Sequence, residues 1–171
     1  DSLFKTFEGT LNDFGNEHGM ANSRARLRMT TLYQVAAANS GIVVGTGNKV
    51  EDFGIGFYTK YGDGGVDISP IADLMKSEVF RLSAELGINQ EILNAKPTDG
   101  LWDDDRSDED QIGANYDDIE KVMKKIDNGE TPENFDKELK KVFDIYTKHH
   151  NANKHKMVEI PICYIPDNLE L

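Results

Sequence analysis

A short apolar run in the first third of the chain passes straight into a glycine turn. Ile42, Val43 and Val44 are β-branched and show no polar alternation, which is typical of a strand buried on both faces of a parallel sheet. The turn at residues 45–48, Gly-Thr-Gly-Asn, follows at once. Open α/β sheets bind ligands at this end of a strand, because glycines let a ligand approach the backbone closely. The run therefore predicts an α/β fold with a ligand site at the strand exit.

A carboxylate and a glycine-rich loop follow this turn. Glu51 comes first, and Lys60 and Asp67 then flank the loop at residues 61–65, Tyr-Gly-Asp-Gly-Gly. The turn does not match a dinucleotide fingerprint, because its third glycine would fall on Val50, and no Gly-Lys-Ser/Thr of a Walker A motif occurs. The combination of carboxylate, glycine loop and separate cations instead indicates a magnesium-bound polyphosphate beside a second anionic substrate.

Composition limits the possible partners. The 171 residues favour a single domain over residues 1–171. A net charge of −12 argues against nucleic-acid or membrane-surface binding, because both partners are anionic, so local cations must hold any anionic ligand. The single cysteine, Cys163, excludes a disulfide framework, fits a reducing, cytoplasmic compartment and is expected to be buried. No apolar run is long enough to span a membrane. The start at Asp1 instead of Met fits a fragment.

Hydrophobic periodicity predicts that most of the chain outside the strand and the loops is helical. Gly15 and Gly19 are expected to break the chain after a first helix, and Asn22 to cap a second helix that reaches Ser40. A tail at residues 154–156 should lead into an extended apolar segment at residues 160–166. The other expected helices end at Gly87, occupy residues 89–93 and 116–127, and run from Thr131-Pro132 to about Asn151.

Two groups of basic residues in this acidic chain have unusual positions: three arginines close together and one lysine at a helix start. Arg24, Arg26 and Arg28 fall within five residues of one helix, which is denser than solubility requires. A solvated surface position is the common explanation for each one, but an anion contact by at least one is expected. Lys76 stands at the start of a helix, where the dipole disfavours a cation. Its position therefore hints at an anionic ligand.

The segment from residue 99 to residue 120 is strongly acidic. It does not match a calcium loop, because the glycine position holds Asp108 and the bidentate glutamate position holds Ala114. A solvated loop is the default interpretation. Residues 99–110 are predicted to be mobile without ligand and to become ordered over the site, because their charge density disfavours packing.

Several motifs lie in order along the chain, at residues 22–29, 44–51, 57–67, 70–76, 97–98, 107–109 and 155–156. Together they resemble the ammonia-dependent NAD synthetases, for which the Lys-Tyr-Gly-Asp-Gly-Gly block at residues 60–65 is highly specific. The resemblance implies an adenine nucleotide α-hydrolase-like, Rossmann-like parallel sheet flanked by helices. It also implies that ATP adenylates nicotinic acid adenine dinucleotide (deamido-NAD), pyrophosphate leaves, and ammonia displaces AMP to form NAD.

The resemblance also implies site residues. Glu51 matches the family's Mg²⁺ ligand, although alone it could equally be a surface acid. Arg24 and Arg28 are neighbours without an assigned role, and His18, His149 and His150 match nothing and are expected at the surface. A homodimer is implied as well. The positions that match ATP-binding residues are Thr46, Lys76 and Thr98, and those that match deamido-NAD-binding residues are Arg26, Lys60, Asp67, His155 and Lys156.

Two departures keep other interpretations open. The family's phosphate-gripping loop, Ser-Gly-Gly-x-Asp-Ser, is missing, so the resemblance covers the carboxyl-terminal part of the fold and the sheet is expected to be incomplete at its N-terminal side. The chain is then a fragment, or a noncatalytic acidic binding or interaction domain. A GMP synthetase-like ligase is a further alternative, against which the block at residues 60–65 argues. The second departure is one extra residue between Glu51 and Lys60, relative to some family members, so a different shape is expected for the loop between these two residues.

Overall fold

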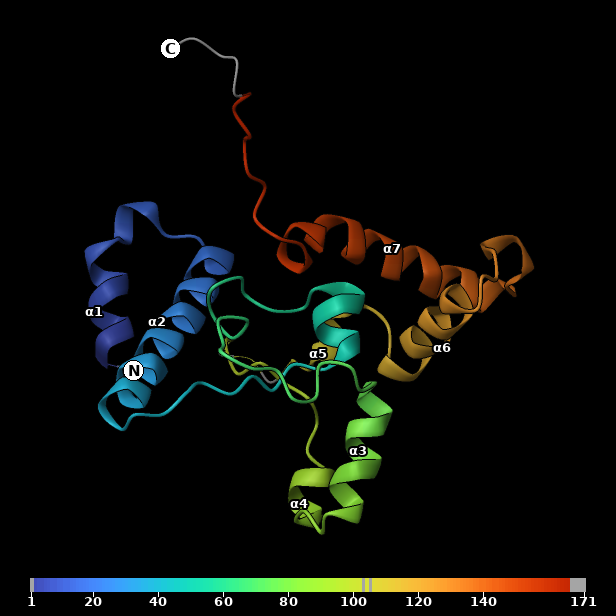
Figure 1. The fold of residues 1–171 in the computed structure, drawn as a ribbon, viewed down its shortest axis with the longest axis horizontal. Coiled ribbons are helices and arrows are strands. Elements are labelled where there is room, and N and C mark those ends of the chain that lie inside the picture. Colours follow the sequence, from blue (N-terminus) through green and yellow to red (C-terminus); the bar gives the residue numbers. More distant parts are fainter. Residues whose placement is uncertain (1, 103, 105, 167–171) are drawn as a thin grey trace.

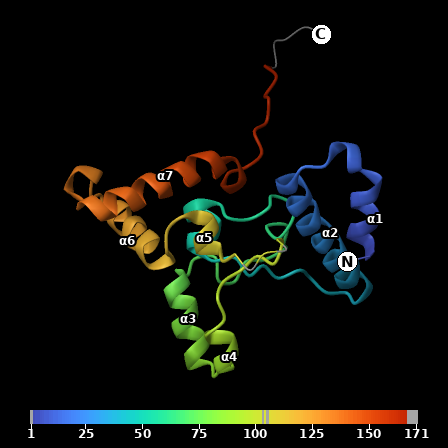
Figure 2. The ribbon, with the colours of Figure 1, turned by 180° about the vertical axis from the view of Figure 1, so that it is seen from behind.

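The computed structural model describes all residues except 1, 103, 105 and 167–171. Figures 1 and 2 show α1 and α2 side by side at one end, α6 and α7 packed together at the other, and α3 with α4 projecting from the centre. Long connecting segments cross the middle. The elements in chain order are α1 (Ser2–Thr10), the 3₁₀ turn η1 (Asn12–Phe14), α2 (Glu17–Ala38), the π-helix η2 (Val50–Ile55), α3 (Lys76–Glu85), α4 (Gln90–Leu93), α5 (Asp108–Ile112), α6 (Tyr116–Asp127), the 3₁₀ turn η3 (Pro132–Asn134) and α7 (Lys137–Met157).

The predicted strand forms only one β-bridge within the described residues. Val44 pairs in parallel with Ile68, and Gly45 N–H donates to the Ile68 carbonyl at 2.7 Å. Val43 is buried, but Ile42 and Val44 keep 59% and 51% of their surfaces exposed. Burial on both faces is therefore wrong for two of the three residues. A parallel sheet needs neighbouring strands and covering helices, and the described residues supply one paired position.

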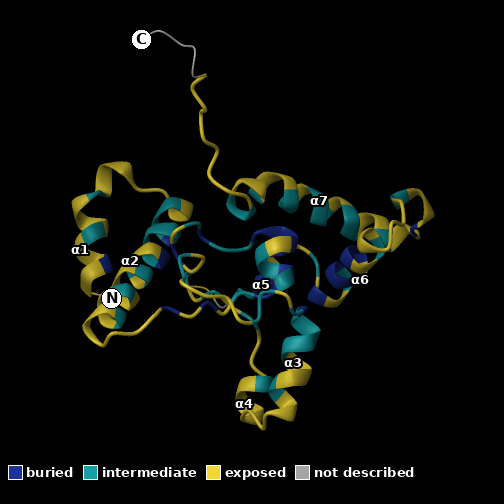
Figure 3. Cartoon of the chain, in the orientation of Figure 1, coloured by how far each residue is buried: buried dark blue, intermediate teal, exposed yellow. Residues whose placement is uncertain are grey.

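The core forms where α6 and α7 pack against the π-helix. Val50 and Ile55 of η2 and Ile119 of α6 are fully buried, and Figure 3 shows this concentration of buried residues. His149 contacts the Ile112 carbonyl at 3.1 Å and His150 the Gly54 carbonyl at 2.8 Å. The predicted surface role of these two histidines is wrong, because both fasten α7 to the core.

The beginning of α2 differs from the prediction. Asn16, not Asn22, caps the helix, and its side chain accepts a hydrogen bond from Gly19 N at 2.7 Å. Gly19 lies in the first turn, where it does not interrupt the helix. Asn22 lies inside α2 and accepts a hydrogen bond from the hydroxyl of Thr59 at 2.6 Å. The first helix also ends before the predicted break at Gly15, because α1 stops at Thr10.

The end of the chain differs as well. Residues 131–132 begin only the turn η3, and Asp136 caps α7 by accepting a hydrogen bond from Leu139 N at 2.8 Å. Because α7 continues to Met157, residues 154–156 lie in its last turn and not in a tail. Residues 158–166 are extended and exposed, as Figure 3 shows. Cys163 is exposed, so its predicted burial is wrong.

Candidate functional site

The turn after Val44 positions the first candidate residues. An added Cβ at Gly45 would come within 2.9 Å of a Val66 methyl and 3.2 Å of the Ile68 carbonyl, so only glycine allows this close approach. Asn48 is buried, and its Oδ1 accepts hydrogen bonds from the N–H groups of Val50 at 3.0 Å and Glu51 at 3.1 Å. Asn48 thereby starts the π-helix and fixes the backbone at Glu51.

A cavity of about 510 Å³ lies beside this turn, and we call it the first cavity. Thr46, Glu51, Lys76 and Thr98 all line it, although they are up to 52 positions apart in the sequence. The structure thus brings together every residue predicted to bind ATP or Mg²⁺. Asp108 of α5, to which the sequence assigned no role, lines the same cavity.

The carboxylates of Glu51 and Asp108 and the ammonium of Lys76 line the first cavity, and the phenol of Tyr116 lies beside them. Lys76 forms an ion pair with Glu51, and the side chains are only 17% and 16% exposed. The Lys76 Nζ also lies 4.8 Å from the centre of the Tyr116 ring. The Tyr116 hydroxyl donates to Asp108 Oδ2 at 3.3 Å. Burial raises the pKa of Asp108, while Lys76 acts in the opposite direction. Burial and then the negative charges of Glu51 and Asp108 raise the pKa of Tyr116.

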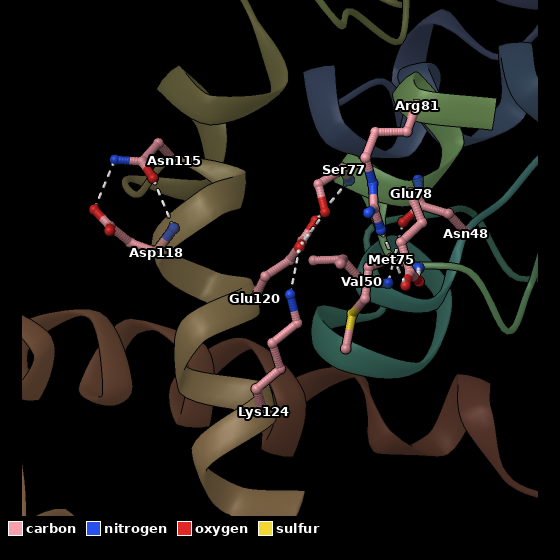
Figure 4. Close-up of polar contacts among 10 residues, drawn as sticks. All are labelled: Asn48, Val50, Met75, Ser77, Glu78, Arg81, Asn115, Asp118, Glu120 and Lys124. Carbon is pink, nitrogen blue, oxygen red and sulfur yellow. Dashed lines mark hydrogen bonds and ion pairs between the residues drawn. The ribbon is translucent and has the colours of Figure 1, made fainter. Parts of the chain in front are cut away.

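The N-terminus of α3 holds Lys76 in place. Glu120 of α6 is buried and accepts hydrogen bonds from the backbone N–H and the hydroxyl of Ser77, each at 2.7 Å (Figure 4). Glu78 accepts from Met75 N at 2.9 Å. These acids at the positive end of the helix dipole offset the unfavourable position of Lys76. Sequence reasoning missed Glu120, and its place beside the apolar stripe of α6 was the only signal.

A second cavity of about 480 Å³ collects most of the candidate deamido-NAD residues. Arg26, Lys60, His155 and Lys156 line it. Asp67 lines neither this cavity nor the first one. Its carboxylate accepts hydrogen bonds from Val43 N at 2.7 Å and from a tyrosine hydroxyl of α2 at 3.1 Å, and so fastens the predicted strand.

The cations of the second cavity already hold protein carbonyls. The Lys156 ammonium donates to the carbonyls of Gly56 at 2.8 Å and Tyr58 at 2.6 Å. Burial lowers the pKa of this lysine, and the negative charge of a nearby aspartate, Asp63, partly offsets that effect. Lys60 Nζ donates to the His155 carbonyl at 2.7 Å. These bonds tie the end of α7 to the loop after the π-helix.

The two cavities share a wall formed by Phe57, Asp63, Asp99 and Leu101. Two arginines of α2 hold the backbone at residues 100–101, which forms part of this wall. Arg24 donates to the Leu101 carbonyl at 2.8 Å, and Arg28 to the Gly100 carbonyl at 3.0 Å. These contacts supply the role that the sequence left open for both arginines. The mobility predicted for residues 99–110 stays a prediction, and two of those residues, 103 and 105, lie outside the described part.

Comparison with known families decides the identity of this fold. The sequence model of NAD synthase matches residues 1–159. The chain belongs to the NAD synthase family. A protein of Thermoplasma volcanium named NH(3)-dependent NAD(+) synthetase is 38% identical over 167 residues, covering 97% of this chain and 65% of that protein. The chain spans only 59% to 65% of the lengths of three curated relatives of that name.

Solved structures agree with this family assignment. The NMN synthetase of Francisella tularensis matches with a TM-score of 0.80 and 31% identity, covering 98% of this chain and 64% of that one. The NH3-dependent NAD synthetase of Campylobacter jejuni matches with a TM-score of 0.72 and 22% identity, over 95% and 62% of the two chains. The chain therefore has the fold of the NAD synthetases, and these names do not favour the GMP synthetase-like and noncatalytic alternatives.

The first cavity of this NAD synthase family member has carboxylates that suit Mg²⁺. No group of three or more His, Cys, Asp or Glu side chains suited to a metal occurs among the described residues. Mg²⁺ does not require such a group, because one or two carboxylates together with substrate phosphates and water suffice. Glu51 and Asp108 line the same cavity, and Oδ1 of Asp108 has no partner among the described residues, so the two carboxylates fit that requirement. In the described part of the chain, no helix has the length and apolar character needed to cross a membrane.

Proposed function

We propose that the protein converts deamido-NAD to NAD, using ATP and ammonia. The observation that carries this proposal is the pair of cavities with a shared wall, one lined by the candidate ATP residues and the other by the candidate dinucleotide residues. Two anionic nucleotides can lie side by side there, with their reacting groups near Phe57 and Asp63. Local cations would hold them on a chain whose net charge is −12.

The reaction proceeds in two steps at this wall. A carboxylate oxygen of the nicotinate attacks the α-phosphorus of ATP, the bond to pyrophosphate breaks, and pyrophosphate leaves with its electron pair. Ammonia then attacks the carbonyl carbon, AMP leaves with the electron pair of the broken C–O bond, and the nitrogen loses a proton. The protein contributes mainly positioning and charge stabilisation.

Each cavity has its own task in this proposal. Thr46, Lys76 and Thr98 bind ATP, with the Lys76 ammonium directed to its phosphates. Arg26, Lys60 and Lys156 bind the phosphates of deamido-NAD, and His155 lies beside them. Mg²⁺ held by Glu51 would offset negative charge on the polyphosphate. Asp67 is assigned to dinucleotide binding by resemblance alone, because its carboxylate holds the backbone of Val43.

We also infer that Ile42 and Val44 belong to a parallel sheet with further strands. Their exposed apolar surfaces support this inference, because burying each one would contribute about 1–2 kcal/mol. The family's phosphate-gripping loop is needed for activity and is not among the 171 residues. Reading the gene upstream of the codon for Asp1 tests for a Ser-Gly-Gly-x-Asp-Ser motif.

Catalysis is tested with the full-length protein. Deamido-NAD, ATP, Mg²⁺ and ammonium should yield NAD, AMP and pyrophosphate in equal amounts, and omission of ATP or ammonium should abolish NAD formation. Calorimetry should show binding of deamido-NAD that Lys156→Met weakens and the neighbouring Lys154→Met does not. Binding without NAD formation would support a noncatalytic domain, and the absence of both would contradict the proposal.

A second candidate is the formation of NMN. It rests on the 31% identity and TM-score of 0.80 to the protein named NMN synthetase. The mononucleotide substrate lacks the adenylate half of deamido-NAD, so it would need fewer contacts in the second cavity. Competition between nicotinic acid mononucleotide and deamido-NAD, with both amide products measured, distinguishes the two. A higher kcat/KM for the mononucleotide would favour the second candidate.

A homodimer and a cytoplasmic location complete the proposal. The homodimer follows from the family resemblance, and the cytoplasmic location from the single cysteine. The single exposed cysteine, Cys163, is compatible with a reducing compartment. Sedimentation of the full-length protein tests the dimer.

A further inference from the structure

We propose that Asp108 is a further carboxylate ligand of a divalent-cation site, shared with Glu51, in the first cavity. The inference deepens the proposed function, on which it rests for the identity of the cation as Mg²⁺. Neither the family resemblance nor the pattern of the acidic segment assigns a ligand role to Asp108. The role follows from the surroundings of its side chain.

One oxygen of Asp108 is buried without a protein partner. The residue is only 7% exposed and lines the first cavity. Its Oδ2 accepts the hydrogen bond from Tyr116, whereas its Oδ1 has no partner among the described residues. Leaving a buried carboxylate oxygen unpaired is unfavourable, because the oxygen loses its hydration without gaining a partner. An unpaired oxygen on a residue that lines a cavity indicates a ligand that can pair with it.

The charges in the cavity indicate a cation as that ligand. Glu51 and Asp108 are both near Lys76, whose ammonium is engaged by Glu51. Two carboxylates therefore face one ammonium, and the cluster has an excess of negative charge. An incoming ATP polyphosphate would increase this excess. A divalent cation offsets the negative charge of the carboxylates and of the polyphosphate. It also allows Lys76 to turn from Glu51 to a phosphate.

Glu51 and Asp108 both lie near Tyr116 and line the same cavity. The phenol of Tyr116 donates to Asp108 Oδ2 at 3.3 Å, and the Lys76 ammonium, which pairs with Glu51, lies 4.8 Å from the centre of the same ring. Backbone bonding fixes Asp108, since its N–H donates to the Pro97 carbonyl at 3.0 Å, next to Thr98. Two carboxylates, with phosphate oxygens and water filling the remaining positions, are a usual Mg²⁺ environment.

The test measures metal binding directly, on the full-length protein with ATP and without deamido-NAD. Mn²⁺ serves as the probe, and electron paramagnetic resonance counts the free ion. Asp108→Asn and Glu51→Gln should each raise the Kd for Mn²⁺ about tenfold or more. Asp117→Asn, an exposed acid on the adjacent helix α6, is the matched control and should leave the Kd unchanged. An unchanged Mn²⁺ affinity in a folded Asp108→Asn protein would overturn the proposal and leave Asp108 as a residue that orients Lys76.

A second readout keeps the metal ligands intact. Tb³⁺ bound between Glu51 and Asp108 would lie beside the Tyr116 ring, so its emission should be excited through tyrosine. Tyr116→Phe should reduce this emission severalfold while Mn²⁺ affinity stays within about twofold. Undiminished emission would contradict the site even if Asp108→Asn failed to fold. If NAD formed normally and Mn²⁺ binding did not depend on Asp108, this inference alone would be refuted. If Mn²⁺ binding depended on Asp108 but no NAD formed, only the proposed function would be refuted.

Discussion

Ser77 donates both its backbone N–H and its hydroxyl to the carboxylate of Glu120, each at 2.7 Å. The two residues are 43 positions apart, and their contact ties the first turn of α3 to the middle of α6 (Figure 4). Lys76 precedes Ser77, so the same contact orients the ammonium that reaches Glu51. The site in the first cavity therefore depends on a buried acid outside that cavity.

Glu120→Ala should destabilise the fold. The substitution leaves two donors of Ser77 without their acceptor, and we expect a loss of about 2–4 kcal/mol in the free energy of unfolding. Urea titration measures it. Asp127→Ala, at the exposed C-terminal end of the same helix, is the control and should be neutral or slightly stabilising, because an acid there opposes the dipole. Equal effects of the two variants would show that the Ser77 contact contributes little.

Asp52→Asn should change the pH dependence of stability. Burial, and then the negative charges of Glu51 and Asp63, raise the pKa of Asp52 from 3.8 to about 6. The folded state therefore binds this proton more tightly than the unfolded state, and the stabilisation is complete below pH 3.8 and lost as the pH rises through about 6. Asparagine does not ionise, so the variant should gain about 1–2 kcal/mol over the wild type above pH 6.

The Asp52 prediction is measured by urea unfolding in buffer with EDTA between pH 4 and pH 7.5. The advantage of the variant should grow up to about pH 6 and then stay constant. Asp144→Asn, on the exposed face of α7, should show no such dependence. A difference between Asp52→Asn and wild type that is the same at both ends of the range would refute the raised pKa.

Lys76→Met and Lys156→Met should affect different substrates. Lys76 lines the first cavity, so its replacement should raise the KM for ATP about tenfold. Lys156 lines the second cavity, so its replacement should raise the KM for deamido-NAD by a similar factor. Steady-state kinetics of the full-length protein separate the two effects, with Lys154→Met as the control. If both variants raised the same KM, the two cavities would not divide the nucleotides as proposed.

Gly56→Ala should separate α7 from the π-helix. Gly56 has a φ of 62°, and an added Cβ would lie 2.5 Å from the Cβ of Asn153. We expect a loss of about 3 kcal/mol, which combines backbone strain with displacement of α7. Gly129 also has a positive φ of 76°, but nothing lies within 4 Å of an added Cβ, so Gly129→Ala should cost only about 1 kcal/mol. Thermal unfolding that gave the same loss for both would contradict the close contact with α7.

The sequence allowed the position of the candidate residues to be predicted better than the sheet. Thr46, Glu51, Lys76 and Thr98 line one cavity, because strand exits and glycine turns constrain where ligands bind, and their binding roles stay predictions. The strand at residues 42–44 could not be confirmed, because a β-branched run specifies a sheet only together with its neighbours. The cap of α2 was misplaced for a local reason: Asn16 and Asn22 are both good capping residues, and tertiary contact with Thr59 places Asn22 inside the helix.

Long-range polar contacts explain the remaining errors. His149 and His150 bond to carbonyls 37 and 96 positions away, and no local pattern announces such partners. Glu120 has an ordinary place in an amphipathic helix, yet its acceptor role depends on α3. The exposure of Cys163 has the opposite cause, because its apolar segment finds no covering surface within the described residues.

The ammonium groups of Lys60 and Lys156 hold the last turn of α7 to the loop at residues 56–60. A phosphate that enters the second cavity therefore competes with carbonyls of the protein for these ammonium groups, and the contacts it gains weaken those that hold the helix end. A more rigid end of α7 should then have a lower affinity for the dinucleotide. Variants that loosen this end, away from the lysines themselves, should bind the ligand more tightly and unfold more easily.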